Sequence, residues 1–129
     1  MGLIIDQLKH TQQEFSIIAG SAGFLLDSLK VGCTGGICAI ANVLGNEVIK
    51  VYDNFMSRNL PEAELIQKKL VDTNKHFTRM FGVAALKASL DANGYYGGPC
   101  RIPLLPLNNS EYEQVKNSFL KNEYSWSLK

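Results

Sequence analysis

Residues 15–41, FSIIAGSAGFLLDSLKVGCTGGICAIA, contain two short apolar runs on either side of a stretch with helical spacing. The first run, over 15–20, is rich in β-branched residues, and the second, over 36–41, is apolar throughout. Such runs are typical of strands buried on both faces of a sheet. The stretch between them predicts a helix over 22–31, which Ser21 can cap. The pattern therefore predicts two parallel strands joined by a right-handed crossover.

The rest of the chain is predicted to be mainly helical. A short amphipathic helix over 3–12 is expected before the first strand. After Asn42 we expect helices over 43–57, from Asn59 to the residue before Gly82, over 83–92, and from 109 to about 121, with a connector rich in proline and glycine over 95–108. The tail through Trp126 is expected to fray.

Two strands alone cannot form a stable sheet when both are apolar on both faces. A sheet of two parallel strands has two open edges and does not bury its own faces. Both runs are apolar on both faces, so each needs cover that two strands and one crossover helix do not supply. We expect the sequence to be a piece of a larger α/β fold.

Composition and charge exclude several classes of function. Lysine and arginine number 13 and aspartate and glutamate 12, with no basic stripe, so nucleic acid is not an expected partner. The apolar runs are far shorter than the roughly 20 residues of a membrane helix, and no targeting segment is recognisable. The three cysteines lack metal-ligand spacing and fit ordinary buried thiols in a reducing compartment.

Four stretches resemble a known family in their letters and in their order. They are residues 15–26 (FSIIAGSAGFLL), 35–45 (GGICAIANVLG), 81–87 (FGVAALK) and 94–107 (GYYGGPCRIPLLPL). Together they resemble the dihydrodipicolinate synthase and N-acetylneuraminate lyase family, from about Asp6 to about residue 121. The connector is the most specific of the four stretches.

The resemblance implies a fold and its division. The chain would be the C-terminal part of a (β/α)₈ barrel, with the two strands as the seventh and eighth. Residues 1–57 would hold the last barrel strands and helices, residues 58–129 the C-terminal helical extension, and 1–129 one single unit. Barrels of this kind carry their chemistry at the C-terminal ends of the strands.

The resemblance also implies a substrate-binding site at those strand ends. The family's glycine that contacts substrate matches Gly20, and the position that offers a backbone carbonyl beside the keto acid matches Ile37. Ser21 is a further candidate because it follows Gly20 at the end of the strand. A glycine at such a place lets a ligand approach the backbone closely.

The family's catalytic groups match no position in this chain. In the family, a lysine on the sixth strand forms a Schiff base, a tyrosine on an earlier strand relays protons, and an early loop binds the carboxylate. We therefore expect no catalytic residue, no metal and no cofactor within residues 1–129. The chain would be a shortened form that is inactive alone.

Within the family, the resemblance is greatest to the mitochondrial aldolases of hydroxyproline breakdown. These cleave 4-hydroxy-2-oxoglutarate to pyruvate and glyoxylate, and family members are commonly tetramers. The resemblance thus implies a small keto-acid substrate, a homo-oligomer and a mitochondrial location. Two alternatives stay open: a non-catalytic helical module that associates with full-length subunits, and a free-standing helical domain unrelated to aldolases.

Several other residues could be taken for catalytic groups, but a structural role is expected for each of them. Lys87 stands among apolar neighbours, but the aliphatic stem of a helical lysine can cover apolar surface while its ammonium reaches out. His10 and His76 have no second ligand at helical spacing, so structural roles are expected for both. Tyr95 and Tyr96 are expected to be a packed aromatic pair that anchors the connector.

Overall fold

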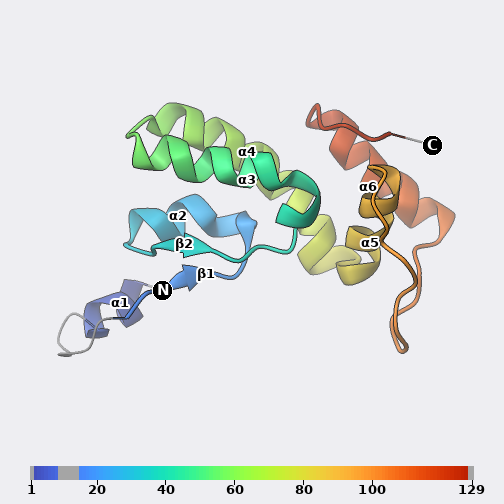
Figure 1. Ribbon diagram of the computed structural model, residues 1–129, viewed down its shortest axis with the longest axis horizontal. Helices are drawn as coiled ribbons and strands as arrows, with labels where there is room; N and C mark the ends of the chain where they lie inside the picture. Colours follow the sequence, from blue (N-terminus) through green and yellow to red (C-terminus); the bar gives the residue numbers. More distant parts are fainter. Residues whose placement is uncertain (1, 9–14, 128–129) are drawn as a thin grey trace.

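The computed structural model describes residues 2–8 and 15–127. Its elements, in chain order, are α1 (Gly2–Leu8), β1 (Ile18–Ala19), the 3₁₀-helix η1 (Ala22–Phe24), α2 (Leu25–Lys30), β2 (Gly35–Gly36), α3 (Ala41–Met56), α4 (Leu60–Lys75), the π-helix η2 (His76–Met80), α5 (Gly82–Ala92) and α6 (Asn109–Lys121). The strands and α2 lie together, α3 and α4 pack side by side over them, and α5 and α6 form a second group (Figure 1). Of the helix predicted over 3–12, the part from 9 onward lies outside the described residues.

The two strands pair in parallel, as predicted. Ile18 is opposite Gly35 and Ala19 is opposite Gly36. The ladder continues on one side, where the N–H of Ile37 donates to the carbonyl of Ala19 at 2.8 Å. Parallel pairing brings the carboxyl ends of both strands to one edge, which positions the candidate site.

Both strands are shorter than predicted. The prediction of a strand over 36–41 is wrong because β2 ends at Gly36, the chain turns at Ala39 and Ile40, and α3 already begins at Ala41. Gly36 sits in a tight place: a Cβ there would lie 2.9 Å from Leu25 Cδ1 and 3.1 Å from the Ala19 carbonyl oxygen. The close packing of Leu25 against β2 therefore requires glycine at this position.

The sheet is covered on one face, whereas burial on both faces was expected. Ala19 is fully buried, but Ile18 is 47% exposed and Ile37 is 75% exposed. The covered face packs against α2, and α3 and α4 complete the core around it. None of the residues that the structure describes covers the opposite face.

The link from β1 to α2 follows the expected chemistry. The Ser21 hydroxyl accepts a hydrogen bond from the Gly23 N–H at 3.2 Å and so caps the first turn. That turn is 3₁₀ rather than α, and the regular helix starts at Leu25. Gly32 ends the helix with a φ of +103°, a conformation that favours glycine.

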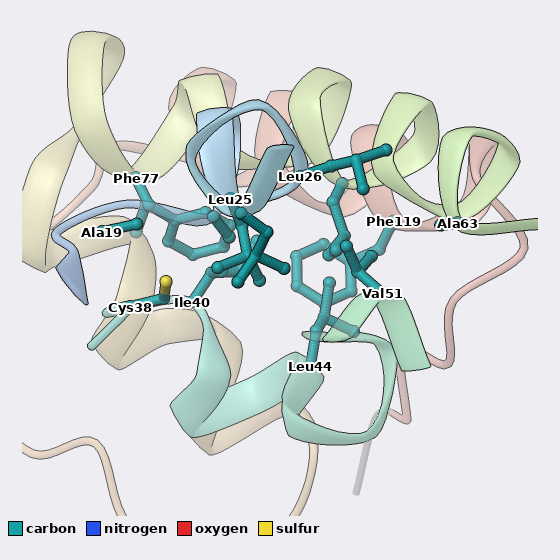
Figure 2. Packing of buried hydrophobic residues seen from close by; sticks show 14 of the residues in the cluster. Ala19, Leu25, Leu26, Cys38, Ile40, Leu44, Val51, Ala63, Phe77 and Phe119 are labelled. Carbon is teal, nitrogen blue, oxygen red and sulfur yellow. The ribbon is translucent and has the colours of Figure 1, made fainter. Parts of the chain in front are cut away.

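One apolar core joins the strand region to the helical extension. The buried cluster drawn in Figure 2 extends from Leu25 and Leu26 of α2 to Val51 of α3 and Phe119 of α6, and all four are almost completely buried. Cys38 also belongs to this core, and burial raises the pKa of its thiol. Together with the burial of Cys33, this confirms the expectation of buried thiols for these two cysteines.

The helix predicted up to Gly82 is interrupted by a wide turn. Regular α-helix ends at Lys75, and a single π-turn follows, in which the N–H of Phe81 donates to the His76 carbonyl at 2.9 Å. His76 is buried and its Nδ1 is 3.2 Å from the Thr73 carbonyl oxygen, to which it donates. This contact agrees with the structural role expected for His76.

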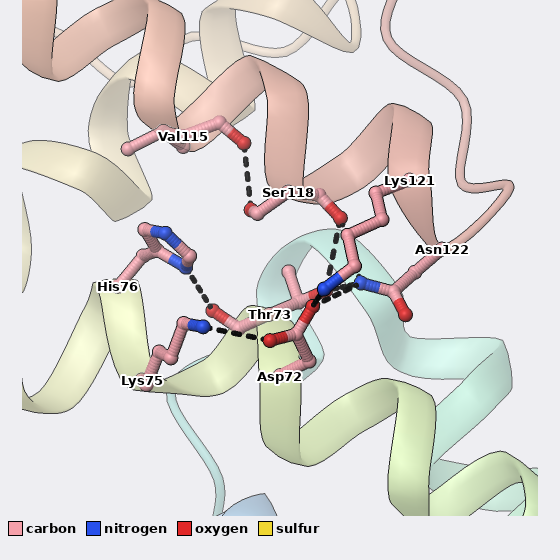
Figure 3. Close-up of polar contacts among 8 residues, drawn as sticks. All are labelled: Asp72, Thr73, Lys75, His76, Val115, Ser118, Lys121 and Asn122. Carbon is pink, nitrogen blue, oxygen red and sulfur yellow. Dashed lines mark hydrogen bonds and ion pairs between the residues drawn. The ribbon is translucent and has the colours of Figure 1, made fainter.

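A polar cluster fastens α6 to α4. The carboxylate of Asp72 accepts hydrogen bonds from Lys75 at 2.7 Å and from Lys121 and Asn122 at 3.0 Å each (Figure 3). The same amide nitrogen of Asn122 also donates to Thr73 Oγ1. The Lys75 ammonium, followed by Asn122 and Lys121, holds the pKa of Asp72 well below its usual range.

The C-terminal tail is packed, so the expectation that it frays is wrong as far as Trp126. The ring of Trp126 lies 5.0 Å from the ring of Phe119 and 5.5 Å from that of Tyr112, measured between centroids. Edge-on aromatic contacts of this kind stabilise a segment beyond the area that they bury. Tertiary packing therefore holds a tail that has no helical structure of its own.

The connector is attached to α5 through Gly97. The Gly97 N–H donates to Asp91 Oδ1 at 2.7 Å, and Lys87 Nζ donates to the Gly97 carbonyl at 2.6 Å. This confirms the structural role of Lys87. Tyr95 and Tyr96 do not anchor the connector, because they are 65% and 84% exposed, and the prediction of a packed pair is wrong.

Replacing Gly97 with alanine tests this attachment. An added Cβ would lie 2.0 Å from the Lys87 carbonyl oxygen, so the connector has to move away from α5. We expect the Gly97→Ala change to lower the free energy of unfolding by about 1–3 kcal/mol, measured by urea denaturation. The control is Gly45→Ala in α3, where a Cβ meets nothing within 4 Å; it should leave stability unchanged or raise it by up to about 1 kcal/mol. Equal effects of the two changes would contradict the packing.

The cluster around Asp72 predicts an acid-sensitive contribution to stability. Because the folded-state pKa of Asp72 is depressed, this contribution is present above its unfolded pKa of about 4 and is lost as pH falls further. We expect Asp72→Asn to cost about 1–2 kcal/mol at pH 7 and progressively less below pH ~4. The exposed Asp53→Asn change in α3 removes the same charge and should cost little at any pH. A pH-independent cost at Asp72 would argue against the charged cluster.

Candidate functional site

The carboxyl edge of the sheet brings two of the predicted site residues together. Gly20 follows the last residue of β1, and Ile37 follows the last residue of β2. They are neighbours because the Ile37 N–H donates to the carbonyl of Ala19, the residue before Gly20. Gly20 is exposed, and a Cβ there would meet nothing within 4 Å. The backbone at this edge is therefore open to a ligand, although contact with substrate stays a prediction for both residues.

Ser21, the third predicted residue, is held more firmly than its neighbours. Its hydroxyl oxygen accepts from the Gly23 N–H at 3.2 Å and from Nδ2 of Asn74 at 3.0 Å. The backbone of Ser21 is extended, with φ −154° and ψ 139°, which turns the chain from β1 into η1. Its side chain is thus oriented both by its own loop and by α4.

Two buried polar side chains of α4 clamp this loop, and sequence reasoning missed both. Gln67 is 8% exposed, and its Oε1 accepts from the Leu26 N–H at 3.1 Å while its Nε2 donates to the Ala22 carbonyl at 2.7 Å. Asn74 is 5% exposed and donates to Ser21. The two stand seven positions apart, on one face of the helix. This spacing of two amide side chains was the sequence signal that could have indicated their shared role.

A cleft of about 600 Å³ opens beside Ser21, between the loop after β1 and the helix α4 with η2. Its lining residues are Ser21, Gly23, Phe24, Lys68, Val71, Asp72, Asn74, Lys75, Thr78 and Arg79. The lining thus contains three cationic side chains and one carboxylate, so the cleft favours an anionic group. Gly20 and Ile37 are not part of the lining.

Other kinds of site find no support in the described part of the chain. Residues 2–8 and 15–127 hold no group of three or more histidine, cysteine, aspartate or glutamate side chains placed to bind a metal ion. No helix in the same ranges is both long and apolar enough to cross a membrane. His10 lies outside the described residues. The cationic lining of the cleft beside Ser21 suits a small anion.

The fold and this edge define a class of protein. Two parallel strands with a covering helix, followed by α3 to α6, form the C-terminal part of a (β/α)₈ barrel with a helical extension. Proteins of this class bind ligands at the carboxyl ends of their strands. The sequence model of the dihydrodipicolinate synthetase family matches residues 1–122, and the chain belongs to that family.

One curated relative is similar to this chain at moderate identity. The chain is 29% identical over 113 residues to 4-hydroxy-tetrahydrodipicolinate synthase 1 of Halalkalibacterium halodurans. The match takes in 88% of this chain and 38% of that protein. The chain therefore spans well under half the length of this relative, and the matched part includes both strands and most of the helices.

Solved structures agree with the fold. Dihydrodipicolinate synthase DapA-2 from Bacillus anthracis superposes with a TM-score of 0.84 at 23% identity, over 93% of this chain and 41% of that one. A putative dihydrodipicolinate synthase from Thermus thermophilus superposes with a TM-score of 0.79 at 32% identity, over 96% and 44%. Both superpositions place this chain within a part of a larger barrel.

Proposed function

We propose that residues 1–129 form the part of a Schiff-base lyase of this family that closes the barrel and lines its substrate site. The proposed substrate is 4-hydroxy-2-oxoglutarate, cleaved to pyruvate and glyoxylate, and the proposed location is the mitochondrion. The open edge at Gly20 and Ile37 carries the proposal, since it lies where barrels of this class bind ligands. The resemblance of residues 94–107 (GYYGGPCRIPLLPL) supports the choice of substrate.

In this proposal the chain binds and orients the keto acid. A lysine on the sixth barrel strand, upstream of the segments present here, attacks the keto carbon and forms an imine with loss of water. Gly20 lets the bound acid lie against the backbone, and the Ile37 carbonyl faces it from the neighbouring strand. Lys87 is no substitute for that lysine, because its ammonium donates to the Gly97 carbonyl away from the sheet edge.

Borohydride trapping tests this division of labour. The chain 1–129 and a fusion of it to the first six strands of the Halalkalibacterium relative are each incubated with pyruvate, reduced with borohydride and analysed by mass spectrometry. Reduction converts the imine to a stable secondary amine. We expect an adduct on the upstream lysine of the fusion and none on the chain alone. An adduct on Lys87, or on any other lysine of residues 1–129, would contradict the proposal.

The substrate is tested with the same fusion. Glyoxylate release from 4-hydroxy-2-oxoglutarate is compared between the fusion and the unaltered relative, with both rates divided by the yield of pyruvate adduct. We expect the fusion to be faster by about tenfold, a factor that a few changed pocket contacts can produce. Equal rates would reject the substrate assignment and leave the Schiff-base role intact.

A second candidate function, a non-catalytic module that joins full-length family subunits, is favoured by exposed apolar side chains. Ile18 and Ile37 are exposed on the sheet, and Ile102 and Leu105 are 91% and 77% exposed on the connector. Exposed apolar side chains on the sheet and on the connector thus offer two places for association. Affinity capture after co-expression with a full-length subunit tests the idea: capture should be lost in a variant with both Ile102→Ser and Leu105→Ser. Failure of the unaltered chain to capture the subunit would reject it.

A further inference from the structure

The hydroxyl of Ser21 has only one hydrogen-bonding capacity left. A serine hydroxyl offers one donor and two acceptor lone pairs. Both lone pairs are used, one by the Gly23 N–H at 3.2 Å and one by Nδ2 of Asn74 at 3.0 Å. The remaining O–H can therefore only donate, and a ligand that meets it has to present an acceptor.

Asn74 is held so that this polarity is maintained. Its side chain is almost fully buried and packs so closely on the loop that a Cβ at Gly23 would lie 2.9 Å from its Nδ2. Two turns earlier, Gln67 fastens the same loop by two hydrogen bonds to the backbone of Ala22 and Leu26. These contacts fasten the loop to α4 and orient the Ser21 hydroxyl without a ligand.

The cleft beside Ser21 indicates the charge of that acceptor. Lys68, Lys75 and Arg79 line it, and the one carboxylate among its lining residues, Asp72, is already engaged by Lys75 and by two further side chains, Lys121 and Asn122. A donor hydroxyl at the wall of a cationic cleft suits a carboxylate. Ser21 lines this cleft and directly follows Gly20 in the chain, so the cleft begins next to the edge at which the keto acid is proposed to bind.

We propose that Ser21 binds the carboxylate of a dicarboxylic 2-oxo acid that lies farther from the imine, and that Asn74 is the positioning residue that keeps Ser21 a donor. This assignment rests on the proposed function, in which the keto end of the substrate lies at the edge formed by Gly20 and Ile37. Ser21 then selects for dicarboxylic over monocarboxylic acids. Pyruvate, which has no second carboxylate, does not use this contact.

The fixed polarity is tested on the chain 1–129 itself by nuclear magnetic resonance. The side-chain amide protons of Asn74 should exchange slowly in the unaltered chain and faster after Ser21→Ala, because the change removes their acceptor. The side-chain amide of Gln67 is the internal control and should not change. If the Asn74 amide is insensitive to Ser21→Ala, the hydroxyl does not accept from it, and the assignment of Ser21 as an obligate donor is overturned.

The ligand is tested in the fusion by borohydride trapping with 2-oxoglutarate and with pyruvate. Ser21→Ala removes the hydrogen bond to the charged carboxylate, and Asn74→Asp supplies an acceptor that draws the Ser21 O–H away from the ligand. Each change should therefore raise the half-saturating 2-oxoglutarate concentration about tenfold. The half-saturating pyruvate concentration should stay within about twofold, and Ser21→Thr should restore tight binding of 2-oxoglutarate. Thr78→Asp adds a negative charge to the same cleft without touching Ser21, and it isolates the effect of charge from that of polarity.

The outcomes separate the two proposals. Equal weakening of both acids, or no weakening of either, overturns the role of Ser21 and leaves the Schiff-base function standing. A similar loss of 2-oxoglutarate binding in Thr78→Asp and Asn74→Asp, with none in Ser21→Ala, also overturns it. Absence of any adduct with both acids contradicts the proposed function, and the assignment of the ligand falls with it.

Discussion

The clamp between α4 and the loop after β1 is the contact on which the arrangement of this chain depends. Gln67 satisfies one N–H and one C=O of a buried loop, and Asn74 bonds to the serine that begins it. Buried polar groups without partners are costly, so removing either amide would leave loop groups unpaired next to the core. Through this clamp, a helix of the extension determines where a strand end of the barrel lies.

Much of the local architecture follows from short-range chemistry and was predictable. The apolar runs, the cap at Ser21 and the helix end at Gly32 each depend on a few adjacent residues. The strand length was not predictable, because β2 ends where Leu25 packs against Gly36, and that contact joins residues from different elements. The burial expected on both faces requires neighbours that the described ranges, 2–8 and 15–127, do not supply.

The candidate site shows the same limit. Gly20 and Ile37 could be placed from the order of the elements, since parallel strands end at one edge. Asn74 was missed because a polar residue on a helix is usually solvated, and only its contact with Ser21 shows otherwise. The packing of Trp126 was missed for a related reason, because aromatic contacts between a tail and α6 leave no periodic trace. Adjacent tyrosines in a connector carry no signal of burial at all.

The π-turn at His76–Met80 determines how an insertion or deletion would alter the helices on either side of it. A π-turn accommodates one residue more than an α-turn, and this one follows Lys75, the last residue of α4, and ends two residues before α5 begins at Gly82. Losing or gaining one residue there rotates α5 about its axis by roughly 100°, as the helical period requires, while the face of α4 that carries the two amides keeps its phase. An insertion or deletion at this turn would therefore change the orientation of α5 and leave the contacts of α4 with the loop after β1 in place.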